Sequence, residues 1–276
     1  MSFINFGVSP YRTVLSLNNV NSLLSDGLER LSTGYRVNRA SDDPAGLAVA
    51  LQLRADDSSA SQALRNTNAG VSMLATAEGA MGEIGNILDR MRELAVQSSS
   101  GTLTSSQRSS IDDEFEELSA EIDRVSTSTE FNDINLTDGS NTSISVQVGI
   151  NGGSDNQIEL TFSDVGASAL AVNVTAMDLS TASAASAAIT GIDEAIEIVA
   201  GERADIGASQ NRLTSASNYM SEFQISTRSA HSSIMDADMA FEIAEISRLQ
   251  VVQSAGIAAL AQANNINMSL ISLLNL

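Results

Sequence analysis

The sequence predicts a mainly α protein with a small β-hairpin, in which long antiparallel helices dominate and the terminal helices pair as a coiled coil. Three observations support this fold class. Only two prolines, Pro10 and Pro44, occur in 276 residues, so almost nothing beyond residue 44 interrupts a helix. Aromatic residues make up 4% of the chain and tryptophan is absent, so the core must consist mainly of aliphatic side chains. Both ends of the chain carry apolar residues at heptad spacing.

At the N-terminal end, apolar residues recur at intervals of three and four, and Asn21 is the single polar position among them. This spacing places them on one seam of a coiled coil. The apolar members of the seam are Val14, Leu17, Leu24, Leu28 and Leu31.

The C-terminal end repeats this pattern around the small residue Gly256. Its other seam members are Val252, Ala259, Ala263, Ile266, Leu270 and Leu273. Residues 249–276 carry no charge, but the Gln and Asn residues that flank the seam argue against a transmembrane helix, so we expect no membrane insertion. Since more than one face is apolar, we expect the ends to order when several copies meet. The alternative is a buried helix of an ordinary bundle.

The two seams predict a terminal coiled-coil polymerisation domain formed by residues 1–44 and 231–276. Residues 45–230 form a second, helical domain. In chain order, helical spacing covers about 45–98, 105–127 and 180–230, and a turn lies at 98–104. Apolar and polar residues alternate over 144–148 and 158–162, on either side of an Asn-Gly-Gly turn, which predicts a β-hairpin at about 143–163.

Charge and composition argue against several classes of function. The net charge is −20 and all 14 basic residues are arginine, so nucleic acid is not expected as a partner. Cysteine is absent and His231 is the only histidine, which leaves little for a thiol, triad or histidine-rich metal site. Phosphate-loop, dinucleotide and nucleophile-elbow patterns are absent as well. The sequence therefore predicts no enzyme, no cofactor and no metal site.

Two groups of acidic residues are better explained as helix starts than as chemical sites. Asp42 and Asp43 precede Pro44, so one of them is the expected N-cap of the helix that follows. In the second group, acids in a first turn offset the helix dipole, and Ser233 or Asp236 can cap the last helix. Metal binding is the alternative for this second group, which consists of Asp236, Asp238, Glu242 and Glu245.

Four ordered segments resemble the signatures of bacterial flagellins. Residues 29–46 (ERLSTGYRVNRASDDPAG) resemble the N-terminal signature, and residues 90–97 and 121–132 resemble its continuation. Residues 236–264 resemble the C-terminal signature. The short middle of the chain is similar to a minimal form that lacks the variable outer domains.

The resemblance implies a structural subunit that polymerises into the bacterial flagellar filament for swimming motility. It implies an extracellular location in the filament and export in unfolded form through the flagellar type III apparatus. The first ten residues lack a basic region and a long apolar run, so we expect no cleaved signal peptide. In such a filament the terminal domain forms the inner packing, and residues 45–230 form a helical wall domain.

The resemblance also implies partners. They are other copies of the chain, an export chaperone, and the filament cap and junction proteins. A Toll-like innate immune receptor recognises an arginine, a leucine and a glutamate in the family, which match Arg90, Leu94 and Glu114 on what we expect to be one helical face. Two other functions stay open at this point: a hook–filament junction protein, and a secreted helical-bundle adhesin or receptor ligand.

Overall fold

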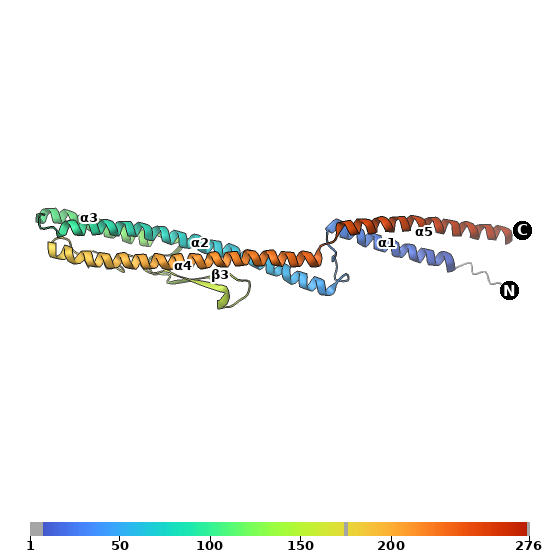
Figure 1. Ribbon diagram of the computed structural model, residues 1–276, viewed down its shortest axis with the longest axis horizontal. Helices are drawn as coiled ribbons and strands as arrows, with labels where there is room; N and C mark the ends of the chain where they lie inside the picture. The colour runs from blue at the N-terminus through green and yellow to red at the C-terminus, as the bar shows by residue number, and fades with distance from the viewer. Residues whose placement is uncertain (1–7, 174–175, 275–276) are drawn as a thin grey trace. The chain divides into compact units, whose positions relative to one another are not determined.

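The computed structural model describes residues 8–173 and 176–274 (Figure 1). Helices predominate in this part of the chain, and the strands are short. In chain order the elements are α1 (Val8–Thr33), α2 (Pro44–Ser99), α3 (Ser105–Ser128), β1 (Glu130–Phe131), β2 (Ile134–Asn135), β3 (Ser143–Gln147), the 3-10 helix η1 (Ser154–Asn156), β4 (Gln157–Thr161), α4 (Ala182–Met235) and α5 (Met239–Leu274). The mainly α fold class with its hairpin is therefore confirmed.

The helices begin where side chains can accept from free backbone amides. Asp43 Oδ1 accepts from the Gly46 amide at 2.8 Å at the start of α2, as expected of one of the two acids before Pro44. At α3, Thr104 and Gln107 form a capping box. The expected cap of α5 at Ser233 or Asp236 is wrong. Asp238 Oδ1 accepts from Ala240 N and Phe241 N at 3.0 Å each, because the helix starts only at Met239.

The predicted hairpin is present as the antiparallel pair β3 and β4, in which Val146 lies opposite Ile158. Val146, Ile158 and Leu160 are buried, whereas Ser145 and Glu159 point to solvent. One face of the hairpin thus packs on the helices. A second ladder, β1 with β2, was not predicted. Its tight turn consists of Asn132 and Asp133, with φ of 53° and 62°, a conformation that these two residue types tolerate.

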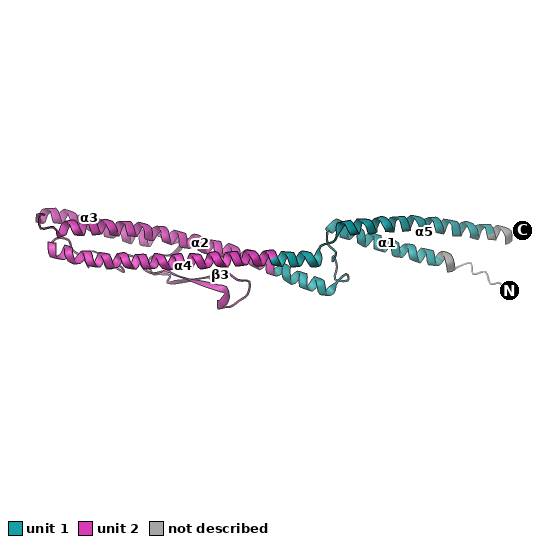
Figure 2. Cartoon of the chain, viewed as in Figure 1, with its two compact units in different colours: residues 1–55, 226–276 teal, residues 56–225 magenta. Residues whose placement is uncertain are grey.

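The chain divides into two compact units, shown in teal and magenta in Figure 2. Unit 2, residues 56–225, contains the larger core, to which α2, α3, α4, the hairpin and the segment after β4 all contribute. Leu74, Met81, Phe115 and Ile192 are among its fully buried side chains. A Cβ at Gly70 would lie 3.1 Å from Leu213 Cδ1 of α4 and 3.4 Å from Val146 Cγ2 of β3, so glycine lets both elements approach α2.

Unit 1 consists of residues 1–55 and 226–276 and contains α1 and α5, which pack against each other. A small apolar cluster of Val37, Ala50 and Met235, with Leu47 and Ile234, lies where α2 begins and α4 ends. None of the described helices has the length and apolarity that crossing a lipid bilayer requires.

We call residues 34–43 and 235–238 the joint, because the chain passes there from α1 to α2 and from α4 to α5. Gly34 adopts a φ of +74°, which ends α1 at no steric cost. Two backbone hydrogen bonds then tie the crossing segments together: Arg36 N donates to Met235 O at 2.6 Å, and Ala237 N donates to Gly34 O at 2.9 Å. The side chain of Arg36 also donates to the carbonyl of Ile234 at 2.8 Å.

Candidate functional site: the paired terminal helices

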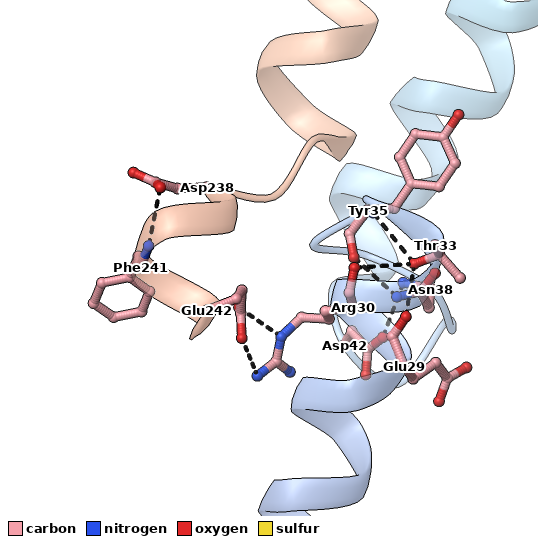
Figure 3. A network of polar contacts seen from close by, with 9 residues as sticks. All are labelled: Glu29, Arg30, Thr33, Tyr35, Asn38, Asp42, Asp238, Phe241 and Glu242. Atoms are coloured by element: carbon pink, nitrogen blue, oxygen red, sulfur yellow. Dashed lines mark hydrogen bonds and ion pairs between the residues drawn. The ribbon is translucent and has the colours of Figure 1, made fainter. Parts of the chain in front are cut away.

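Polar side chains hold α1 and α5 together at two levels. Near the joint, Arg30 Nε donates to Glu242 Oε1 at 2.7 Å and a second guanidinium nitrogen donates to Oε2 at 3.2 Å (Figure 3). This bidentate bond to the buried carboxylate raises the pKa of Arg30 above its ordinary value. Farther along the helices, Gln253 Nε2 donates to Asn21 Oδ1 at 2.7 Å. The two helices therefore run antiparallel in a defined register.

Glycines let the two helices approach closely, one between these two polar contacts and one beyond the second. A Cβ at Gly27 would lie 3.1 Å from Ile246 Cγ1, and a Cβ at Gly256 would lie 2.8 Å from Leu17 Cδ1. Any larger residue at Gly256 would therefore displace Leu17 or separate the helices.

Each predicted seam consists of two lines of residues seven apart, and the structure separates these lines. In α1, the inner line of Leu17, Leu24 and Leu31 is half-buried. Val14 and Leu28, which with Asn21 form the outer line of α1, are exposed.

The same division holds in α5. Gly256 and Ala263, on the inner line, are half-buried, whereas Val252, Ala259 and Ile266, on the outer line, are exposed. The side chains of Leu270 and Leu273 lie outside the described residues.

The deepest contacts of the pair involve residues that the sequence reasoning missed. Val20, Ile246 and Leu249 are buried, and Glu242 and Gln253 contribute the polar bonds described above. Positions 242, 246, 249, 253 and 256 have heptad spacing of their own. A search for apolar residues alone passes over it, because two of its positions carry polar side chains. The signal available in the sequence was this spacing itself, once polar residues are allowed at heptad positions.

The joint folds from the segment that carries the N-terminal signature. Asp42 Oδ2 accepts from Asn38 N at 3.0 Å and from Arg39 N at 2.9 Å, and these two backbone hydrogen bonds lower the pKa of Asp42 (Figure 3). Asn38 Nδ2 in turn donates to Tyr35 O at 2.9 Å. His231 packs edge-on against the ring of Tyr35, with centroids 6.5 Å apart, so its observed role is packing.

The four acids near the start of α5 have separate structural partners. Asp238 caps the helix, Glu242 pairs with Arg30, Glu245 pairs with Arg248, and Asp236 accepts from Ser232. Across residues 8–173 and 176–274, no group of three or more His, Asp or Glu side chains is arranged to hold a metal ion.

The three residues matched to a receptor site do not share one helical face. Arg90 is exposed on α2, and its guanidinium pairs with Glu114 of α3 at 2.7 Å and with Glu93 at 3.0 Å. These bonds raise the pKa of Arg90. Leu94 is only 1% exposed and belongs to the core of unit 2. In this conformation Leu94 supports the helix from inside, and Arg90 and Glu114 form the accessible part of the set.

Comparison with protein families finds matches that cover both terminal helices and the joint. The model of the bacterial flagellin N-terminal helical region matches residues 4–142, and that of the C-terminal helical region matches residues 189–274. The chain belongs to the bacterial flagellin family. It is a structural, non-enzymatic subunit of the extracellular flagellar filament, and flagellins polymerise with copies of themselves.

Curated flagellins are similar over nearly the whole chain. The flagellin of Halalkalibacterium halodurans is 40% identical over 247 residues, which cover 90% of this chain and 90% of that protein. The flagellin of Bacillus subtilis is 35% identical and covers 98% of this chain and 99% of its own length. Flagellin FlaB1 of Treponema pallidum is 33% identical with equal coverage.

Solved structures agree with the fold. The crystal structure of Bacillus cereus flagellin has a TM-score of 0.50 and 32% identity, and covers 56% of this chain and 88% of that one. A Vibrio parahaemolyticus structure described as a flagellar hook-associated protein has a TM-score of 0.61 and covers 71% of this chain and 100% of that one. Its identity is 18%, so it supports the fold alone. Only residues 162–181 lie between β4 and α4 in this flagellin, which leaves no room for a large variable domain.

Proposed function

We propose that this flagellin polymerises through the outer lines of α1 and α5: Val14 and Leu28 on α1, and Val252, Ala259 and Ile266 on α5, with Leu273 continuing the last of these. The observation that carries the proposal is that the first five of these side chains are exposed in the single chain although they have coiled-coil spacing. The inner lines, including Leu270 by spacing, serve the pairing of α1 with α5. A neighbouring copy is therefore the natural cover for the outer lines.

The proposal extends to the roles of the two parts of the chain. Residues 1–44 and 231–276 form the terminal polymerisation domain, and residues 45–230 form the wall domain with the hairpin. The division of the structure into units at 55 and 225 supports two roles without depending on the exact limits. The uncharged stretch from residue 249 onward also supports the proposal, because an interface core is depleted of charged residues.

The test introduces a carboxylate on the outer line of α5. Ile266→Asp should raise the critical concentration for seeded filament growth about tenfold or more, because an unpaired charge would be buried between copies. The matched control is Ile198→Asp in α4. Ile198 is 46% exposed against 51% for Ile266, and it lies in a surface groove with Glu194, Glu197 and Glu202.

Electron microscopy and sedimentation of growing filaments measure both variants. Equal effects of Ile266→Asp and Ile198→Asp would show that the outer line has no special part in assembly. A normal critical concentration for Ile266→Asp would overturn the proposal outright.

We also propose the flagellar partners and the export route that the family suggests. The chain passes unfolded through the type III apparatus, a chaperone covers the C-terminal segment, and the cap and junction proteins contact the filament ends. The exposed apolar residues of α5 support a covering partner before assembly. A junction protein would share the terminal helices, and its scarcity in sheared filaments distinguishes it from a filament subunit.

Recognition by a Toll-like innate immune receptor is a further part of the proposal. Arg90 and Glu114 supply an exposed ion pair, and Leu94 holds α2 in place beneath it. Arg90→Ala should reduce activation of receptor-bearing cells by purified monomer. The control is Arg124→Ala, which removes a comparably exposed arginine that pairs with Glu121 on α3. Undiminished activation by Arg90→Ala would exclude this residue from the receptor site.

A further inference from the structure

The methionines of this flagellin differ sharply in their exposure to solvent. Eight of the nine lie in the part of the chain that the structure describes. Five of them are buried: Met73, Met81, Met91, Met220 and Met235. Met177 is half-buried, with its terminal methyl group against Gly191 of α4. Met239 and Met268 are 43% and 68% exposed, and both belong to α5.

The two exposed methionines lie on one face of α5. Ile257 and Met268 follow Met239 by 18 and 29 residues, which is close to five and eight turns at about 3.6 residues per turn. Ile243, one turn after Met239, is exposed on the same side, as is Ile257. We call Met239, Ile243, Ile257 and Met268 the methionine stripe. It borders the face that packs on α1: Ile246, seven residues or about two turns after Met239, is buried, and so is Leu249.

We propose that Met239 and Met268 are oxidation sites at which peroxides convert the thioether to a sulfoxide and thereby block incorporation of the subunit into a filament. The thioether sulfur attacks one peroxide oxygen, the O–O bond breaks, the sulfur keeps that oxygen, and with hydrogen peroxide the other oxygen leaves as water. The sulfur is oxidised by two electrons and the peroxide is reduced. The block rests on the proposed function and adds a second contact to it: a neighbouring copy covers the methionine stripe, which lies on a different face of α5 from the outer line of Val252, Ala259 and Ile266.

Exposure and composition make these two sites selective. The chain has no cysteine, so no thiol within it competes for the oxidant. The five buried thioethers are shielded by the apolar clusters to which they belong, and oxidation there would require unfolding. A sulfoxide on the methionine stripe replaces an apolar surface by a strongly polar one, which loses free energy when a neighbouring copy covers it.

The first experiment treats full-length monomer and assembled filament with dilute hydrogen peroxide and follows each methionine by peptide mass spectrometry. In the monomer, Met239 and Met268 should be oxidised well before the five buried methionines. In the filament both should be protected. Uniform oxidation of all methionines in the folded monomer, or equal oxidation of the stripe in monomer and filament, would overturn the proposal.

The second experiment measures assembly after oxidation. Oxidised wild-type monomer should show an about tenfold higher critical concentration, and the two methionine sulfoxide reductases should restore it. The double variant Met239→Leu with Met268→Leu should respond far less to peroxide when compared with its own untreated sample. Met177→Leu, a volume-conserving change in unit 2, should assemble normally and keep the full peroxide response.

The outcomes separate this inference from the proposed function. If Ile266→Asp impairs assembly but oxidised wild-type assembles normally, only the oxidation site fails. If neither change affects assembly, the proposed assembly surface fails as well.

Discussion

A chain that lacks residues 249–276 should form no filaments, yet residues 56–225 should keep their fold. The deletion removes the outer line of α5 together with Leu249, Gln253 and Gly256, which pack on α1 or bond to it. The main core lies entirely between residues 71 and 216, so it loses no contact from within its own cluster. Assembly and the stability of unit 2 should therefore separate cleanly.

Three measurements check this result. Electron microscopy of seeded samples reports growth, far-UV circular dichroism reports helix content, and thermal unfolding reports the stability of unit 2. The matched control is a full-length chain in which residues 249–276 are shuffled at constant composition, which destroys both heptad lines without changing length or charge. Filaments from the truncated chain, or a large fall in the unfolding temperature of unit 2, would contradict the assignment.

Glu242→Ala should weaken the pairing of α1 with α5 by about 2–3 kcal/mol. The mutation leaves the guanidinium of Arg30 without its bidentate partner inside a contact from which water is largely excluded. The loss should appear as a lower melting temperature of the filament and as faster hydrogen exchange in peptides from residues 20–33 and 239–250. Far from this contact, in unit 2, exchange should be unchanged.

Glu245→Ala is the matched control for that prediction. Glu245 also pairs with an arginine, Arg248, but the pair is more exposed and lies on one helix, so its loss should cost about 0.5 kcal/mol or less. The double variant Arg30→Met with Glu242→Met should recover much of the stability, because no unpaired charge remains. Equal losses for Glu242→Ala and Glu245→Ala would mean that burial of the first pair contributes nothing.

Periodicity was sufficient to predict most of the fold, because long helices and a regular hairpin repeat their signal many times. The limits of α2, α3 and α4 fall close to those expected, and alternating residues located β3 and β4. The ladder of β1 and β2 escaped notice because each strand has two residues and therefore no period. Its local signal was the Asn132-Asp133 pair, which favours a turn with positive φ.

The candidate site was harder to predict, since spacing gives the period of a seam but not its orientation. Two lines on each helix had apolar residues, and only the packed pair distinguishes exposed Val14 and Val252 from half-buried Leu17. The bond between Arg30 and Glu242 joins residues 212 positions apart, so no local sequence pattern predicts it. Likewise, the burial of Leu94 follows from packing within unit 2 and could not be seen from its match to a family motif.

The paired hydrogen bonds of the joint limit how its four helix ends can move. Two independent linkers would let α1 swing without α5, but Arg36 and Ala237 fasten one crossing segment to the other through their backbones. Rotation at one crossing is therefore transmitted to its neighbour, and the number of independent degrees of freedom falls. The joint therefore moves as one unit, and a force applied to either terminal helix is shared by both crossing segments of the joint.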